Sequence, residues 1–172
     1  NTINAQRRFA LFQNNFDYFC AFTDITSQIQ STGNGNYTLS DLDLQSFISP
    51  TAYCNNRTNF GGWAIVIVYK NETLPLNQLN VYDGLQGVSA DRQNLNLTLN
   101  SLNVIDNDGA KIGFVAWEGD KNLAVNETLK INGNTLSNAL NPPNNAFNGT
   151  NTFTNSTTLY NMDSVSYTHL TL

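Results

Sequence analysis

Several short runs along the chain alternate apolar and polar residues, the pattern of β-strands with one buried face. In FDYFCAF, at residues 16–22, apolar side chains recur at every second position from Phe16 to Phe22. In NLNLTLNSLNV, at residues 94–104, three leucines alternate strictly with Asn and Thr. We predict half-buried strands at both places, the second being the clearest. Further strands are predicted at residues 37–47, 78–84, 111–119 and 127–133.

One run is apolar without alternation. GGWAIVIVYK, at residues 61–70, places seven apolar residues in succession from Trp63 to Tyr69. A membrane-spanning helix needs roughly 18–20 such residues, so this run is too short to cross a bilayer. A strand that is apolar on both faces is typical of the middle of a β-structure covered on both sides. We therefore predict a buried central strand here.

Turn-forming Asn, Gly and Pro residues separate these runs at intervals of about 8–15 residues, as in sandwiches and barrels. The predicted fold is all-β: an antiparallel β-sandwich, jelly-roll-like, with at most one short helix. That helix is expected within DITSQIQ at residues 24–30, where two isoleucines lie four residues apart. Residues 1–164 are predicted to form a single domain, with residues 1–15 as a lead-in strand or N-terminal arm. The chain opens NTINAQ, which suggests a piece excised from a longer polypeptide.

The C-terminal VSYTHL, at residues 165–170, resembles the translation of a sequencing adapter. We interpret residues 165–172 as an artefactual tail. The only histidine, His169, would then lie outside the natural protein. Without it, Ser-His-Asp and Cys-His nucleophilic sites and His-ligated metal sites are excluded. A Gly-rich phosphate loop is also missing, because GNG at residues 33–35 lacks the lysine and helix that should follow.

The composition favours an extracellular protein. Charged residues make up 12% of the chain, against about 25% in typical globular domains, while Asn alone accounts for 29 residues and Ser plus Thr for another 29. The net charge of −5, with no basic cluster beyond Arg7–Arg8, argues against nucleic acid as a partner. Seven Asn-x-Ser/Thr sequons occur where about five are expected by chance from this composition, so they carry little information.

The two cysteines, Cys20 and Cys54, are predicted to form a disulfide. It would close a loop of about 35 residues and stabilise the fold by roughly 3–4 kcal/mol. The alternative is a pair of buried free thiols, because two cysteines do not by themselves decide the compartment.

Carboxylates are the remaining candidates for chemistry. Glu118 and Asp120 lie two residues apart in WEGD, and with Asp83 or Asp91 they would supply the two carboxylates of a glycosidase. We favour the simpler interpretation that WEGD is a charged turn, and we predict no catalytic residue. DNDG at residues 106–109 begins like a calcium loop, but a hairpin turn explains it as well. No cofactor or metal site is therefore predicted, with calcium kept as an alternative.

Aromatic side chains suggest a second kind of site. A row of exposed rings would make a sugar-stacking platform, for which the candidates are Tyr53, Phe60, Trp117 and Phe147. Trp63 and Trp117 lie in predicted core strands, so packing is the expectation for both. The candidate ligand-binding residues are Trp117, Glu118, Asp120 and Tyr53.

Four blocks together resemble a β domain of very large secreted, adhesin-like surface proteins of gliding-type bacteria. They are FDYFCAFTDIT at residues 16–26, GGWAIVIVYKNETLPLNQLNVYDGLQGV at 61–88, AKIGFVAWEGDKNL at 110–123 and LKINGNTLSNALNPPNNAFNGT at 129–150. The resemblance spans residues 16–163. The departures from the pattern of those proteins are Lys70 for Glu, Leu85 for Phe, Trp117 for Tyr and Asn138 for Asp.

The resemblance implies a cell-surface location, secretion by the type IX system, neighbouring domains in the same polypeptide and a structural or adhesive role. It supplies no catalytic residue. The loop NALNPPNNAFN, at residues 138–148, is expected to be rigid and hydrogen-bonded, and to cover a sandwich edge or present a binding surface.

The leading functional hypothesis is a non-catalytic structural or adhesive module of a secreted cell-surface protein, acting in surface attachment or as a stalk domain. It would contact neighbouring domains, surface glycans or other surface proteins, without inserting into a membrane. The first alternative is a carbohydrate-binding module of a secreted hydrolase. The others are a glycosidase-like enzyme and a subunit that polymerises by strand exchange, with residues 1–15 as the donor arm.

Overall fold

The computed structural model describes residues 2–49, 51–56, 58, 60–103, 110–117, 119–120, 122–152 and 165–171. The chain is mainly β, with a few short helices. By its internal contacts it divides into two compact units, whereas the sequence predicts one domain over residues 1–164. Unit 1 comprises Asn1–Asp41 and Tyr69–Asn103, and unit 2 comprises Leu42–Val68 and Val104–Leu172. Both units are therefore assembled from segments distant in the sequence.

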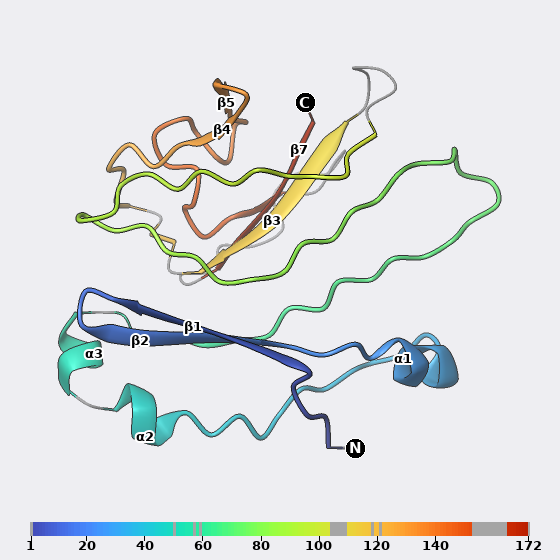
Figure 1. Cartoon of the computed structure of the whole chain (residues 1–172), viewed down its shortest axis with the longest axis horizontal. Coiled ribbons are helices and arrows are strands. Elements are labelled where there is room, and N and C mark those ends of the chain that lie inside the picture. Colours follow the sequence, from blue (N-terminus) through green and yellow to red (C-terminus); the bar gives the residue numbers. More distant parts are fainter. Residues whose placement is uncertain are drawn as a thin grey trace. The chain divides into compact units, whose positions relative to one another are not determined.

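Unit 1 contains a β-hairpin of strands β1 (Arg7–Gln13) and β2 (Phe16–Phe22), shown in Figure 1. Along β2 the side chains alternate between half-buried and exposed, which confirms the strand predicted from the spacing of its apolar residues. Asn14 and Asn15 connect the strands with φ of 53° and 63°. Positive φ at both central residues is what a two-residue type I′ turn requires, and Asn tolerates it well.

The hairpin also bears on the donor-arm hypothesis. Residues 7–13 pair with β2 of the same chain, from Arg7 opposite Phe22 to Gln13 opposite Phe16. Residues 7–13 are therefore paired within their own chain in this structure, and polymerisation by strand exchange stays a hypothesis. The lead-in strand, the other interpretation of this segment, is the one that agrees with the hairpin.

Helix α1 (Thr26–Thr32) follows the hairpin and confirms the short helix predicted within residues 24–30. The Asp24 carboxylate accepts a hydrogen bond from the Thr26 backbone N–H at 2.8 Å, which satisfies one donor of the first turn. Hydrogen bonding from Thr26 holds the pKa of Asp24 below its usual range. The helix ends at Gly33, whose φ of 72° is accessible to glycine at little cost.

The rest of unit 1 runs extended without forming ladders. Two of its segments, residues 78–89 and 92–103, are joined at the turn between them by mutual backbone hydrogen bonds of Ser89 and Arg92, at 3.0 and 3.1 Å. Further from the turn, side chains join them: Gln78 Nε2 and Asn80 Nδ2 donate to the Ser101 carbonyl at 2.6 and 3.1 Å. Gln78 Oε1 also accepts from the Asn103 N–H at 2.9 Å. The strand predicted at residues 78–84 is therefore wrong, as is the one at 94–104 over its described residues 94–103. Amide side chains take up the main-chain groups that a neighbouring strand would use.

Unit 2 begins with two helices that the sequence did not predict, α2 (Gln45–Ile48) and α3 (Thr51–Asn55). Asp43 Oδ1 accepts a hydrogen bond from the Gln45 N–H at 3.1 Å, a turn-forming bond that starts α2 within the strand expected at residues 37–47. Over the described part of the chain there are three short helices, so the prediction of at most one was wrong.

The strands of unit 2 form two small sheets. Strand β3 (Lys111–Trp117) pairs antiparallel with β7 (Val165–Thr171) (Figure 1). Strand β7 also pairs in parallel with β6 (Asn151–Thr152). Strands β4 (Leu129–Ile131) and β5 (Asn134–Leu136) form a hairpin across Asn132–Gly133. Strand β3 confirms the prediction for residues 111–119 over residues 111–117, and β4 confirms the one for residues 127–133 over residues 129–131 only. The pairing of β7 does not show whether residues 165–172 belong to the natural protein, so their interpretation as a translated adapter stays a prediction.

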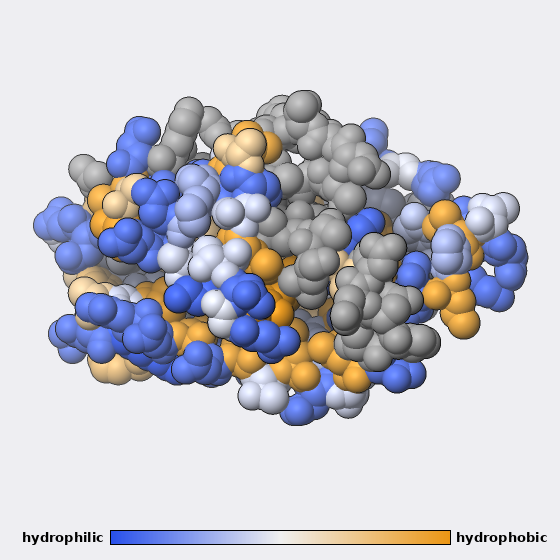
Figure 2. All heavy atoms as spheres, turned by 90° about the horizontal axis from the view of Figure 1, so that it is seen from above, coloured by the Kyte–Doolittle hydropathy of each residue, from blue (hydrophilic) through white to orange (hydrophobic). Residues whose placement is uncertain are grey.

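The run GGWAIVIVYK is not a buried central strand, which corrects the prediction for residues 61–70. No backbone hydrogen bond joins it to another segment within the described residues. Val66 and Val68 are 65% and 60% exposed, and Trp63 is 53% exposed. A strand needs a partner backbone in register, and none is paired here. Figure 2 shows that hydrophobic residues reach the surface between polar ones on the face drawn.

Candidate functional site

The most deeply buried side chains of the described residues belong to the loop at residues 138–150, which we call the Asn loop. Most of them are polar: Asn141, Asn145, Asn148 and Thr150, beside the apolar Ala146. Asn141 is 2% exposed. Its Nδ2 donates to the Ala146 carbonyl at 2.9 Å and to Thr150 Oγ1 at 3.1 Å. Buried amides are tolerated because they have partners.

The other side chains of the Asn loop complete the network. Asn148 Nδ2 donates to the Leu140 carbonyl at 2.6 Å, and Thr150 Oγ1 donates to Asn148 Oδ1 at 2.6 Å. Asn138 Oδ1 accepts from the backbone N–H groups of Leu140 and Asn141, at 2.8 and 2.9 Å. The prediction of a hydrogen-bonded loop is confirmed.

The Asn loop also holds the chain that follows β3. Asn145 Nδ2 donates to the Asp120 carbonyl at 3.1 Å, and the Ala146 N–H donates to the Glu127 carbonyl at 3.0 Å. The ring of Phe147 meets Phe114 of β3 edge-on, with centroids 5.3 Å apart. A side chain at Gly119 would collide with the Phe147 carbonyl, so the two backbones approach as only glycine permits.

The aromatic candidates for a sugar platform are packed rather than open. Trp117, at the end of β3, stacks on Phe60 with ring centroids 6.4 Å apart and planes 13° apart. Tyr53, on α3, and Phe147 are half-buried like Trp117 and Phe60. The Tyr53 carbonyl accepts from the Thr58 N–H at 3.1 Å. The rings of Trp117, Phe60 and Phe147 therefore contribute to packing, and Tyr53 is half-buried.

Of the two WEGD carboxylates, Glu118 lies outside the described residues, and Asp120 is exposed. A carboxylate that the structure places near Asp120 is Glu127, which the sequence did not single out. Burial, and after it the charge of Asp120, raises the pKa of Glu127. Glu127 Oε2 is buried without a hydrogen-bond partner among the described residues. The ionised Glu127 carboxylate therefore destabilises the folded chain, and stability is lost as the pH rises through the raised pKa.

The remaining candidates divide between the units. Asp83, in unit 1, forms an ion pair with Arg7, whose Nε lies 2.8 Å from its Oδ2. Cys20 lies half-buried in unit 1 and Cys54 exposed in unit 2, and both are free thiols in this structure, so their disulfide stays a prediction. DNDG lies outside the described residues, and within them no three His, Cys, Asp or Glu side chains gather as metal ligands would.

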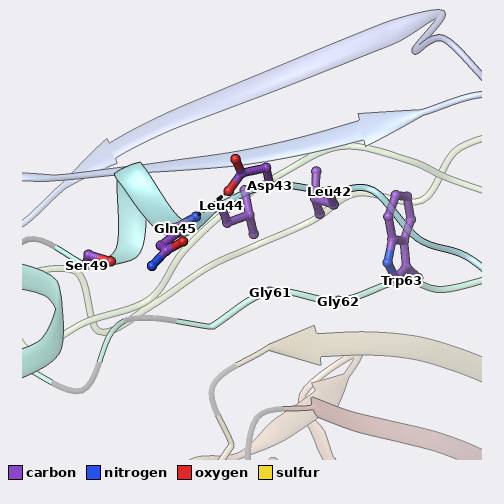
Figure 3. A pocket seen from close by; sticks show the side chains of 8 residues that line it. All are labelled: Leu42, Asp43, Leu44, Gln45, Ser49, Gly61, Gly62 and Trp63. Atoms are coloured by element: carbon purple, nitrogen blue, oxygen red, sulfur yellow. Dashed lines mark hydrogen bonds between the residues drawn. The ribbon is translucent and has the colours of Figure 1, made fainter.

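Unit 2 also contains an open pocket of about 480 Å³ between residues 42–49 and 61–63, shown in Figure 3. Leu42 and Trp63 stand at one end of it and Ser49 at the other. The other lining residues are Asp43, Leu44, Gln45, Gly61 and Gly62. The volume lies within the usual range of small-molecule sites, roughly 300–1,000 Å³.

Two glycines let the walls of this pocket come together. A Cβ at Gly61 would lie 2.7 Å from Leu44 Cδ1, and one at Gly62 would lie 2.7 Å from the Trp117 ring. Any larger residue would force these neighbours apart. Sequence reasoning missed this pocket because it assigned Trp63 to the core. The Gly-Gly pair directly before Trp63 was the available signal, because adjacent glycines often mark a close backbone approach.

Among the described residues, no helix is long and apolar enough to cross a membrane. Comparison with known protein families, with curated proteins and with solved structures finds no match for this chain.

Proposed function

We propose that this chain is a non-catalytic extracellular module of a longer cell-surface protein, with an adhesive or structural role. Its complete fold would be an antiparallel β-sandwich of jelly-roll type. The observation that carries the proposal is the exposure of the apolar run from Trp63 to Tyr69. Single exposed apolar residues are ordinary, but a contiguous stretch of them marks a surface that contacts something else.

The free energy available at this run is considerable. Burying a Val or Ile side chain fully gains about 1.5–3 kcal/mol, and here several such side chains stand more than half exposed in succession. Because consecutive side chains of an extended segment point to opposite faces, both faces of the run are apolar. A neighbouring domain of the same polypeptide or an attachment surface would therefore be a favourable cover.

The contacts made by Asp120 and Trp117, two of the candidate site residues, support a structural role. The Asn145 amide is bound to the Asp120 carbonyl, and the Trp117 ring is stacked on Phe60. These side chains hold segments of unit 2 together. The sandwich itself is supported by the antiparallel strand pairs β1–β2 and β4–β5.

The proposal is tested by adsorption. We would measure the mass of protein bound to an apolar and to a polar coated quartz crystal, for the native chain and for the double variant Val66→Lys/Val68→Lys. The native chain should adsorb to the apolar surface. The double variant should bind more than about tenfold less tightly, because it loses roughly 2 kcal/mol of apolar contact.

A charge-matched control separates apolar contact from charge. Asn94→Lys/Asn96→Lys adds the same two charges at the same spacing on exposed polar positions, and it should adsorb like the native chain. Equal adsorption of all three proteins would overturn the proposal, as would a native chain that stays off the apolar surface.

A further inference from the structure

The pocket between residues 42–49 and 61–63 offers an open aromatic face. Trp63 lines one end of it and is 53% exposed, whereas Trp117 is packed against Phe60. An indole with one free face suits a ligand that presents flat C–H surface, because the ring is apolar over its faces while its N–H still donates. The C–H face of a pyranose ring is such a surface.

Polar groups extend along the pocket from that end. Asp43 provides a carboxylate, Gln45 an amide and Ser49 a hydroxyl. The Asp43 carboxylate already accepts the Gln45 N–H through Oδ1 at 3.1 Å, which fixes its orientation. Carboxylate, amide and hydroxyl together can accept from and donate to sugar hydroxyls, which themselves do both.

The base of the pocket is held in place by close packing. Gly62 lies against the Trp117 ring so tightly that a Cβ would come within 2.7 Å of it, and Trp117 is in turn stacked on Phe60. The two tryptophans thus differ in role: Trp117 supports the backbone at Gly62, and the next residue, Trp63, is 53% exposed.

We propose that this pocket binds a neutral carbohydrate, with a pyranose ring stacked on Trp63 at one end and hydroxyls further along the ligand bound by Asp43, Gln45 and Ser49. The ligand is neutral because Asp43, the one charged side chain among the described lining residues, is a carboxylate, which repels sialic and uronic acids and sulfated sugars. This inference rests on the proposed adhesive function and names a ligand class for it.

The test is a glycan array that includes neutral and anionic sugars, followed by titration of the best neutral glycan. Isothermal titration calorimetry measures the affinity of the native chain and of each variant, because a fluorescence signal from Trp63 would be absent from the variants that replace it. Trp63→Ala should weaken binding by at least about tenfold, as loss of a stacking partner does. Gln45→Ala should weaken it several-fold.

Two further variants are controls. Phe47→Ala removes an exposed ring of α2 that does not line the pocket, so it should bind like the native chain. Trp63→Phe keeps a stacking ring and should retain part of the affinity, which keeps the test decisive if Trp63→Ala fails to fold. A blank array, binding confined to anionic glycans, or affinity unchanged in Trp63→Phe and Gln45→Ala would each overturn the inference.

The adsorption experiment distinguishes this inference from the function on which it rests. A blank array with intact adsorption to the apolar surface would overturn the sugar site and leave the adhesive module standing. A blank array together with no adsorption to the apolar surface would overturn both the sugar site and the adhesive function. Neutral-glycan binding without adsorption would support the pocket and reject the apolar run as the means of attachment.

Discussion

At the scale of single residues, Asn141 shows how buried amides stabilise this chain. We predict that Asn141→Ala lowers the free energy of unfolding by about 1–3 kcal/mol, because the Ala146 carbonyl and Thr150 hydroxyl lose a buried donor. Urea denaturation would measure the change. Asn144→Ala, an exposed residue of the same loop, should stay within about 0.5 kcal/mol of the native chain. Equal losses in both variants would contradict the prediction.

The two cysteines give a second prediction at this scale. Burial, and after it the negative charge of Asp83, raises the pKa of the Cys20 thiol, so less of it is ionised at a given pH. Because the thiolate is the reactive form, Cys54, which is exposed, should be alkylated well before Cys20. The lag should shrink as the pH is raised. Peptide mass spectrometry would follow both sites over time.

The same labelling decides between free thiols and the disulfide predicted from the sequence. If Cys20 and Cys54 were joined, neither would be alkylated until a reductant was added. Equal labelling rates for the two residues without reductant would contradict the effect of burial on Cys20.

At the scale of elements, the β1–β2 hairpin depends on its two-residue turn. Asn15 has a φ of 63°, which costs an ordinary side chain about 1–2 kcal/mol. We predict that Asn15→Ala destabilises the chain by about that amount, whereas Asn15→Gly leaves it as stable or more so, because Asn-Gly is a preferred type I′ sequence. Thermal unfolding of the three proteins would test this. A stabilising alanine would show that another turn is formed.

How far the sequence predicts these elements depends on where their hydrogen-bond partners lie. The alternation at residues 16–22 is followed by a strand because the partner strand is adjacent and a short turn sets the register. The alternation at residues 94–104 is just as regular. There, however, the side chains of Gln78 and Asn80 bind the backbone groups of residues 101 and 103, and no ladder forms. Side-chain periodicity shows which face is apolar, not which backbone is the partner.

The candidate site was predictable only where its interacting residues are close in the sequence. The Asn and Pro content of residues 138–148 predicts a hydrogen-bonded loop, because those interactions are local in the sequence. The pocket lining comes from two segments, residues 42–49 and 61–63, and its aromatic wall is a residue that an apolar run assigns to the core. Only the path of the backbone brings Trp63 beside Asp43 and Gln45, so composition alone does not reveal the site.

At the scale of the whole molecule, net charge and exposed apolar surface act against each other. The chain carries a charge of −5 at pH 7 and reaches zero near pH 4.5. Charge repulsion keeps copies apart at neutral pH, and it fades towards the isoelectric point while apolar attraction remains. We predict that self-association, measured by light scattering, is greatest near pH 4.5. At pH 7 it should rise with salt, which screens the repulsion.

The variants designed for adsorption separate the two contributions. Val66→Lys/Val68→Lys and Asn94→Lys/Asn96→Lys each bring the charge at pH 7 from −5 to −3. If repulsion alone set the association, both would associate more than the native chain. Because the first variant also loses apolar surface, we expect it to associate less and the second to associate more. The same change in both would show that the run from Trp63 to Tyr69 contributes nothing to contacts between molecules.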